Sequence, residues 1–325
     1  MGGKKKAVLM GPFVGELYWE GGRFAPMLPY MRNKQYRGRD DITYIILTRK
    51  ERFDLYGKFA DILVPLNIPG DYQTRSPNCF KLNGLKKFEY LEIVEKFKKK
   101  YSGRFKIIKH IYPDVNKGVY DNKNQFPRSQ MRYVYAPRDE NYKLVHDYLP
   151  NVKPWVVLSP RFRKGFKRNW KHWQKFYDLL WSKKDLLKEY TFIICGKKGE
   201  YRPDNQGRFY DMNNIVLGEN SSLVGILLVI LENTYFTFGS QSAIPNFSLL
   251  YGVEVFEFGC QRMLHTKTYN VKNAPITFIE NRRYDLDPKE ALTKLEKLLR
   301  RKKKNGKPMV TPKQQTSAVN KKTTY

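Results

Sequence analysis

The chain of 325 residues carries 61 Lys and Arg against 31 Asp and Glu, which gives a formal net charge of +30 at pH 7. Its 41% hydrophobic and 15% aromatic residues exclude a wholly disordered basic protein, because such chains lack the apolar side chains that offset the entropy of folding. The charge excess favours a polyanionic partner: nucleic acid, an anionic membrane surface or a phosphorylated substrate.

The first half of the chain alternates short apolar runs with amphipathic segments. The runs predict buried strands, and the segments between them have the spacing of helices with one apolar side. We expect strands at 7–10, 42–47, 62–66 and 105–108, and helices near 26–31, at 50–59 and at 85–100. This alternation is typical of a parallel α/β sheet.

The same alternation begins again after Pro154. A final helix is expected to begin at Asp287 and Pro288, because Asp is a favourable N-cap and proline a favourable first helical residue. The other elements expected in this half are strands at 155–159, 192–196, 215–217, 235–239 and 253–258, and helices at 170–181, 221–231 and 243–251.

The sequence therefore predicts an α/β fold of two Rossmann-like parallel-sheet lobes facing a cleft. We place the first lobe at residues 1–150 and the second at 151–299. Ligands of such sheets bind beyond the carboxyl ends of the strands. Residues 300–325 hold nine Lys and Arg and no acidic residue, and we expect them to form a basic, disordered tail.

Cysteine usage and hydropathy indicate the compartment. Cys79, Cys195 and Cys260 lie far apart and form no CxxC pair, which argues against a disulfide framework or a cysteine-rich zinc site. The longest apolar run, at 223–231, is much shorter than the ~20 residues of a membrane-spanning helix. We expect a cytoplasmic protein without a transmembrane segment; the sequence predicts no oligomeric state.

Parts of both halves resemble a known family. In the second half the similar parts are the run 156–160, the basic residues up to Trp170, the run 192–196 with Glu200, and the segments 214–223 and 236–259. They resemble the donor lobe of two-domain (GT-B) glycosyltransferases, in particular the ADP-heptose:lipopolysaccharide heptosyltransferase group. In the first half, Gly15-Glu16 and the segment 26–29 are similar, more loosely, to the family's Gly-Asp loop and the proline-containing helix after it.

This resemblance makes Glu16 the candidate general base, where the family has Asp. Sugar transfer to a hydroxyl needs a carboxylate within hydrogen-bond reach to accept the proton. The alternative is a solvated carboxylate, or a helix-start residue favoured by the helix dipole. The resemblance also implies transfer without a metal or another cofactor. Asp285-Leu286-Asp287 matches the acidic motif of metal-dependent transferases only weakly and is better explained by helix capping, and the four histidines show no ligand spacing.

Loops at strand ends are candidates for binding a nucleotide-sugar donor. Arg161 and Lys164 follow the strand at 155–159, where cations would stabilise the leaving diphosphate and an Arg offers paired donors. The alternative is a solvated basic loop, or one that contacts a polyanionic acceptor. The remaining candidates, at the ends of two other strands, are Gly196, Glu200, Gly239, Ser240, Gln241 and Ser242. The last four begin the segment 239–244, which replaces the family's Asp-Ser-Gly-Pro-x-His; helix N–H groups there suit a phosphate, and ordinary serine capping is the alternative. For 196–200 the alternative is a surface turn.

Two stretches mix cations with aromatic rings, which suits nucleic acid because cations bind phosphates and rings stack on bases. In 126–133 the candidates are Arg128 and Arg132, and in 161–173 they are Lys167 and Arg168. The alternative for the second stretch is that its tryptophans, with Phe176, are core residues of a helix.

We therefore expect a hexosyl- or pentosyltransferase that moves a sugar from a nucleotide sugar to a hydroxyl. The high charge outside the tail favours a hydroxymethylated pyrimidine in DNA as acceptor, as in a viral DNA-modifying enzyme of the host cytoplasm. One alternative is a transferase that acts on a glycan or lipopolysaccharide. Another is a non-catalytic nucleic-acid-binding protein on a transferase-like fold.

Overall fold

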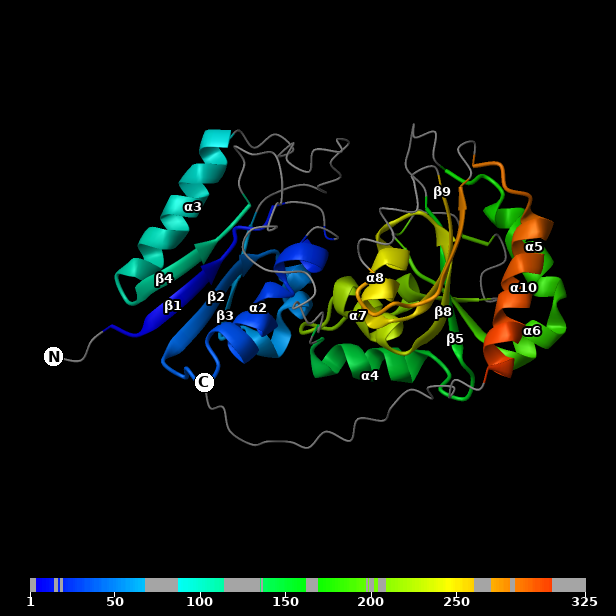
Figure 1. Ribbon diagram of the computed structural model, residues 1–325, viewed down its shortest axis with the longest axis horizontal. Helices are drawn as coiled ribbons and strands as arrows, with labels where there is room; N and C mark the ends of the chain where they lie inside the picture. Colours follow the sequence, from blue (N-terminus) through cyan, green and yellow to red (C-terminus); the bar gives the residue numbers. More distant parts are fainter. Residues whose placement is uncertain are drawn as a thin grey trace.

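The computed structural model describes residues 4–14, 17, 20–67, 87–113, 135, 137–161, 169–196, 198, 202–203, 209–259, 270–280 and 284–305. These residues form two lobes, each built on a parallel sheet, that lie next to each other along the long axis (Figure 1). The predicted α/β fold of two Rossmann-like lobes is thereby confirmed. None of the described helices is long and apolar enough to cross a bilayer.

The first sheet has four parallel strands in the order β3-β2-β1-β4. The central β1 is apolar on both faces, as expected of a strand covered on both sides. Ala7 and Leu9 pack with Tyr90 and Val94 of α3, whereas Val8 on the other face joins the core that reaches the second lobe. The elements are β1 Lys6–Met10, β2 Ile42–Thr48, β3 Ile62–Pro65, β4 Lys106–Ile111 and α3 Lys87–Ser102.

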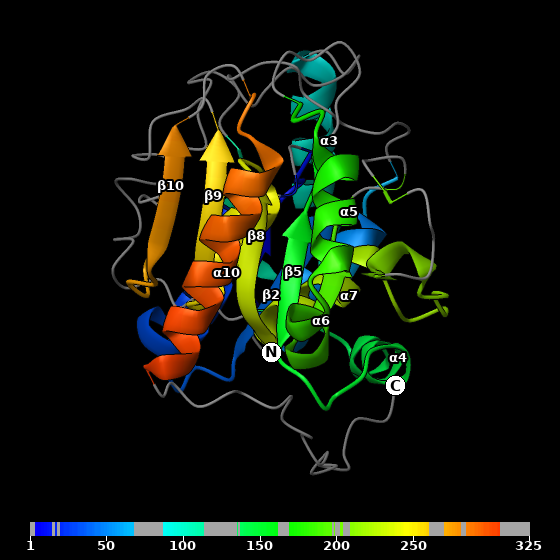
Figure 2. The same cartoon turned by 90° about the vertical axis from the view of Figure 1, so that its right-hand side faces the viewer.

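The second sheet has six parallel strands in the order β10-β9-β8-β5-β6-β7. Helices α5 and α10 pack against each other and cover one face, and α7 and α8 lie on the other (Figure 2). The strands are β5 Trp155–Ser159, β6 Thr191–Ile194, β7 Tyr210–Asp211, β8 Thr234–Ser240, β9 Glu254–Gly259 and β10 Ile276–Glu280. The helices are α5 Trp173–Ser182, α6 Lys184–Glu189, α7 Leu223–Glu232, α8 Ala243–Tyr251 and α10 Pro288–Lys304.

A continuous hydrophobic core joins the two lobes. It contains Ile46 of β2, Val157 of β5 and Phe247 of α8, because α7 and α8 turn toward the first lobe (Figure 1). The ring of Tyr135 lies 5.9 Å from that of Phe247, and its hydroxyl donates to the carbonyl of Gly21. The smaller elements of this region are η1 Glu20–Phe24, α2 Met27–Tyr30, η2 Met31–Gln35, η3 Lys50–Leu55, η4 Gly57–Phe59, α4 Asp139–Tyr148 and η6 Met212–Asn214.

A fully buried carboxylate fixes the polar part of this contact. Asp54 of η3 accepts hydrogen bonds from the backbone N (2.8 Å), Nε (3.1 Å) and Nη2 (3.0 Å) of Arg138, which precedes α4. It also accepts from Asn141 Nδ2 at 3.0 Å and from the hydroxyl of Ser222, the N-cap of α7. Ser222 N in turn donates to Asn141 Oδ1 at 3.0 Å. One carboxylate thus ties η3 of the first lobe to α4 and to α7 of the second.

Several elements differ from the sequence expectations. The segment 50–59 forms two short 3₁₀ helices, η3 and η4, in place of one α-helix. No strand forms at 215–217, where Val216 is 84% exposed; the edge strand is β7 instead. Sequence patterns missed α4, α6 and β10. Residues 300–304 belong to α10 and not to the tail, and the lobe boundary near residue 150 stays a prediction.

Candidate functional site

Three neighbouring strands end together at the carboxyl edge of the second sheet. Ser159 of β5 pairs with Gly239 of β8, which pairs with Glu257 of β9. Side-chain alternation places Ser159 on the same face as Trp155 and Val157, which is the face covered by α7 and α8. A Cβ atom on Gly239 would lie 2.5 Å from the Ser159 carbonyl oxygen, so glycine is what lets these strand ends approach so closely.

The N-terminus of α8 lies against this edge. Its N-cap Ser242 makes no side-chain capping hydrogen bond; instead its hydroxyl lies 3.1 Å from that of Ser159. Gln241 N donates to the Phe258 carbonyl at 2.8 Å, which fixes the turn to the end of β9. Helix N-termini attract anions, because their first N–H groups point outward and the helix dipole is positive there. The edge therefore presents hydroxyl groups beside an anion-favouring helix end.

Arg161 supplies a cation to the same place. Its guanidinium donates to the Gln241 carbonyl. This hydrogen bond joins the residue after β5 to the turn between β8 and α8. The Gln241 side chain lies over the end of β9, since a Cβ atom on Gly259 would be 2.5 Å from its Oε1 atom. The structure thus brings together five of the predicted donor-binding residues, namely Arg161, Gly239, Ser240, Gln241 and Ser242.

The backbone of Ser240 lies at this edge, but its side chain points away from α8. By alternation with Phe236 and Phe238, its hydroxyl faces the α5 side of the sheet, opposite to α8. The side chain is fully buried, and among the described residues its oxygen has no hydrogen-bond partner.

Glu257 is a site residue that sequence reasoning missed. Its carboxylate is fully buried next to Gly239, at the carboxyl end of β9. The sequence placed it only in a strand, at 253–258. The signal that would have found it is an acidic residue inside an apolar run, because burying a charge is costly unless it has partners.

Gly196 lies on the other side of β5, in a separate polar cluster. Its carbonyl accepts from Asn213 Nδ2 at 3.0 Å and from Arg202 Nη2 at 3.4 Å, and Arg202 forms an ion pair with Asp211. Sequence reasoning missed these three partners. The neighbouring Cys195 is no candidate nucleophile, because burial raises the pKa of its thiol.

Other expectations have clear outcomes. Asp287 caps α10 by accepting from Lys289 N at 2.8 Å and Glu290 N at 3.1 Å, which confirms the predicted capping. The hydrogen bond from Glu290 N, followed by that from Lys289 N, lowers the pKa of this carboxyl group.

Trp170, Trp173 and Phe176 are fully buried in the core that α5 covers. These three rings are therefore core residues, as the alternative interpretation held.

The remaining predicted site residues lie outside the described residues. They are the candidate base Glu16, the donor-binding candidates Lys164 and Glu200, and the acceptor candidates Arg128, Arg132, Lys167 and Arg168. Among the residues that are described, no three His, Cys, Asp or Glu side chains gather in a way that suits a metal ion.

At the carboxyl edge of the first sheet, the residues that follow β1 are held by several hydrogen bonds. Gly11 has a φ of +100°, and its N donates to the Ile111 carbonyl at 2.8 Å. His110 Nε2 lies 2.9 Å from the Gly11 carbonyl; a carbonyl only accepts, so this nitrogen carries the proton. Burial lowers the pKa of His110. The Tyr90 hydroxyl donates to the next carbonyl, that of Pro12, at 3.2 Å.

Another acidic residue, Glu20 at the start of η1, is buried and hydrogen-bonded. Its carboxylate accepts from Arg52 Nη1 at 2.7 Å, from the Tyr56 hydroxyl at 3.0 Å and from the hydroxyl of Thr48. The side chain is 0% exposed, so an acceptor cannot reach it in this conformation. Glu20 is thus a structural partner of Arg52, and sequence reasoning did not single it out.

Comparison with known proteins gives matches of structure alone. No protein-family model matches the sequence, and no curated protein does. The glycosyl transferase family 9 structure from Veillonella parvula DSM 2008 has a TM-score of 0.53 and 10% identity, over 91% of this chain and 89% of that one. ADP-heptose lps heptosyltransferase II from E. coli has a TM-score of 0.54 and 11% identity, over 92% and 99%. The chain therefore has the two-lobe GT-B fold of these glycosyltransferases, which confirms the resemblance at the level of fold.

Proposed function

We propose that this protein is a glycosyltransferase that takes its sugar from a nucleotide-sugar donor. The observation that carries the proposal is the carboxyl edge of the second sheet, where Arg161, Ser159 and Ser242 meet the N-terminus of α8. A cation, hydroxyl donors and a helix N-terminus together suit the diphosphate of such a donor. The name of the E. coli structure, an ADP-heptose heptosyltransferase, supports a nucleotide sugar as the donor class.

The proposed reaction is a direct displacement. Glu16 accepts the proton of the acceptor hydroxyl, whose oxygen forms a bond to the anomeric carbon while the bond from that carbon to the diphosphate breaks. The electron pair leaves with the diphosphate, which Arg161 and Lys164 stabilise without a metal. Gly196 and Glu200 are proposed for the nucleoside end of the donor, with Glu200 on a ribose hydroxyl.

The acceptor is the finer part of the proposal. The net charge of +30 supports a polyanion, and we propose a hydroxymethylated pyrimidine in DNA, as a viral DNA-modifying enzyme would use. On this proposal Arg128, Arg132, Lys167 and Arg168 contact the acceptor. The names of the two neighbours give DNA no support, and the E. coli protein's name favours lipopolysaccharide, which is the competing acceptor.

The test is a panel of nucleotide sugars incubated with hydroxymethylated DNA, plain DNA and lipopolysaccharide, with products read by mass spectrometry. Transfer to hydroxymethylated DNA alone is the expected result. Transfer only to lipopolysaccharide would replace the DNA acceptor, and no transfer with any donor would leave the non-catalytic nucleic-acid-binding alternative.

Two variants test the residue roles in the same assay. Glu16→Gln should abolish turnover and leave donor binding measurable by calorimetry, whereas Glu92→Gln, on the exposed face of α3, should behave as wild type. Arg161→Gln should lower kcat roughly 100-fold, as loss of one oxyanion-stabilising donor does. Wild-type turnover in Glu16→Gln would refute the assignment of the base.

A further inference from the structure

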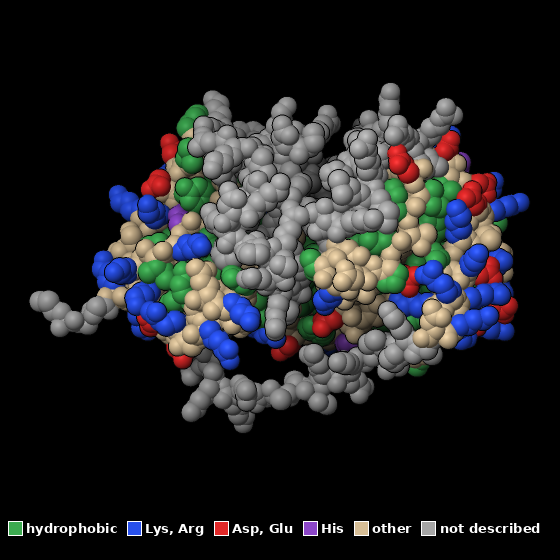
Figure 3. All heavy atoms as spheres, in the orientation of Figure 1, with side chains coloured by type: hydrophobic (Ala, Val, Ile, Leu, Met, Phe, Trp, Pro, Cys, Tyr) green, Lys and Arg blue, Asp and Glu red, His purple; other side chains and the backbone are tan. Residues whose placement is uncertain are grey.

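The outer face of α10 concentrates positive charge. The helix carries eight Lys and Arg against two Glu. Its apolar side chains, among them Leu292, Leu295 and Leu299, are buried against the second lobe, and its exposed positions are all polar. In Figure 3, Lys and Arg side chains with Asp and Glu among them cover the end of the molecule where α10 and α6 lie.

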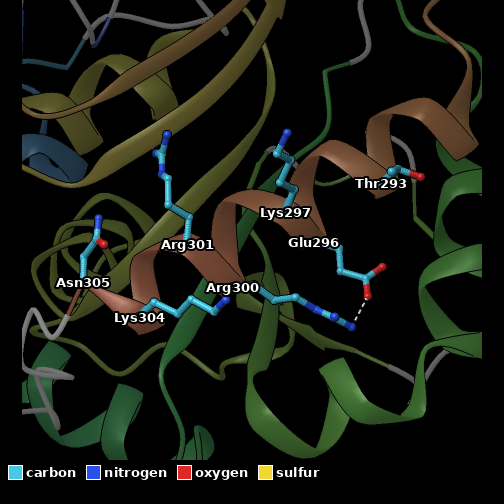
Figure 4. A pocket seen from close by; sticks show the side chains of 7 residues that line it. All are labelled: Thr293, Glu296, Lys297, Arg300, Arg301, Lys304 and Asn305. Carbon is cyan, nitrogen blue, oxygen red and sulfur yellow. Dashed lines mark hydrogen bonds and ion pairs between the residues drawn. The ribbon is translucent and has the colours of Figure 1, made fainter.

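Four cations line one open hollow on this face, together with Glu296, Thr293 and Asn305. Lys297, Arg300, Arg301 and Lys304 follow the spacing i, i+3, i+4 and i+7, and the hollow over them measures about 480 Å³. Figure 4 shows Lys297 and Arg301 extending on one side of the helix and Arg300 and Lys304 along the other. Arg300 is 67% and Arg301 51% exposed; Arg300 pairs with Glu296 and Arg301 with Glu254. In the described part of the chain no acidic side chain pairs with Lys297 or Lys304.

This face lies far from the candidate donor site. Arg301 pairs with Glu254, the first residue of β9, and Lys302 Nζ donates to the carbonyl of Tyr235 near the start of β8. The cations therefore lie at the amino edge of the second sheet, whereas the donor site lies at its carboxyl edge. A strand of seven residues such as β8 separates the two edges by about 20 Å.

The side chains on the outer face of α10 indicate which class of polyanion it binds. A helix that inserts into a bilayer interface needs a free apolar side, and the apolar side of α10 is occupied by packing, so α10 offers a membrane only its charges. Unpaired bases are held by aromatic rings, which the exposed positions of α10 lack. A single phosphate has no enclosed pocket here, whereas a duplex presents a closely spaced row of charges to a helix ~25 Å long.

We infer that the outer face of α10 docks the phosphate backbone of duplex DNA without reading its bases. DNA bound there is held about 20 Å from the candidate donor site. The choice of DNA over duplex RNA rests on the proposed function; the existence of the docking face does not.

The test compares two double variants with the same change in net charge. Lys297→Gln with Lys304→Gln removes two cations of the face, and Lys34→Gln with Lys99→Gln removes two exposed lysines of the first lobe. Each is titrated with a plain DNA duplex of about 30 base pairs by fluorescence anisotropy across a salt series. The assay contains no sugar donor, so a failure of the transferase proposal leaves its result unchanged.

We expect the α10 variant to weaken binding roughly 10- to 30-fold at physiological salt and to flatten the plot of log K against log salt by about 2. The first-lobe variant should change both quantities much less, and Lys297→Arg with Lys304→Arg should restore wild-type binding. Equal losses in both double variants, or no salt dependence, would overturn the inference. So would loss of binding to phosphatidylserine vesicles with duplex binding intact, because the face would then serve a membrane. Tighter binding of an RNA duplex of equal length would overturn the choice of DNA alone.

Discussion

Removal of the Asp54 carboxylate should weaken the contact between the two lobes. In Asp54→Ala the backbone N–H and guanidinium of Arg138, the amide of Asn141 and the hydroxyl of Ser222 lose their shared acceptor. Asn141 is fully buried and Ser222 is 3% exposed, so water cannot replace the carboxylate without rearrangement. The variant tests whether this carboxylate holds η3, α4 and α7 together.

The expected cost follows from these contacts. Breaking a buried ion pair by removing one partner costs about 3–5 kcal/mol. Arg138 is 27% exposed and can turn toward water, which places its share at the lower end. The stranded Asn141 amide adds about 1–3 kcal/mol, whereas Ser222 keeps the hydrogen bond that it accepts from Gly225 N. Allowing for non-additivity, we expect a loss of about 4 kcal/mol, a large part of the ~5–15 kcal/mol that stabilises a typical protein.

Urea unfolding followed by far-ultraviolet circular dichroism measures this loss. The control is Asp41→Ala, because Asp41 pairs with Arg39 and Lys6 at an exposed site of the same lobe and its loss should leave stability close to wild type. A broader or two-step transition in Asp54→Ala would fit separate unfolding of the lobes. If Asp54→Ala unfolds at the same urea concentration as Asp41→Ala, the carboxylate does not hold the lobes together.

Two further predictions concern the sheet edges. Gly239→Ala should cost about 1–3 kcal/mol in the same urea assay, because the added Cβ would meet the Ser159 carbonyl oxygen at 2.5 Å; Gly103→Ala, with no atom within 4 Å, is the matched control, and equal effects would contradict the packing argument. Burial lowers the pKa of His110, so the unfolded chain binds more protons as the pH falls below about 6.5, and stability should be full above that pH and decline below it. His110→Gln should make this decline shallower between roughly pH 7.5 and 5.5, and an unchanged pH dependence of the urea midpoint would exclude His110 as a contributor.

The fold was accessible from the sequence because the central strands are buried on both faces. β1, β5, β6 and β8 are almost entirely buried and mostly apolar, and such runs alternating with amphipathic segments leave few topologies. The elements that were missed carry weaker signals. α4 and α6 are short and highly charged, and β10 is an edge strand with no fully buried residue.

The part of the candidate site that the sequence predicted is the turn between a strand and a helix. The turn at 239–242 follows an apolar strand and precedes an apolar helix, so its position at a sheet edge follows from the pattern alone. Glu20 and Asp54 were not predictable in this way, because they look like solvated residues in the sequence, whereas Glu257 stands inside an apolar run. The burial of Glu20 and Asp54 depends on partners 28 to 168 positions away, which only the tertiary structure brings together.

The end of α10 shows how a run of like charges can mislead. Five consecutive cations from Arg300 predicted disorder, since like charges repel, yet a helix C-terminus favours cations through the helix dipole. Here Arg301 and Lys302 both converge on Glu254, and Lys302 Nζ lies 4.3 Å from the centre of the Tyr235 ring. These contacts hold the last turn in place and occupy an acidic group that is 5% exposed. Because Arg301 and Lys302 occupy Glu254, that carboxylate neutralises no other cation, and in the described part of the chain no acidic side chain pairs with Lys297 or Lys304.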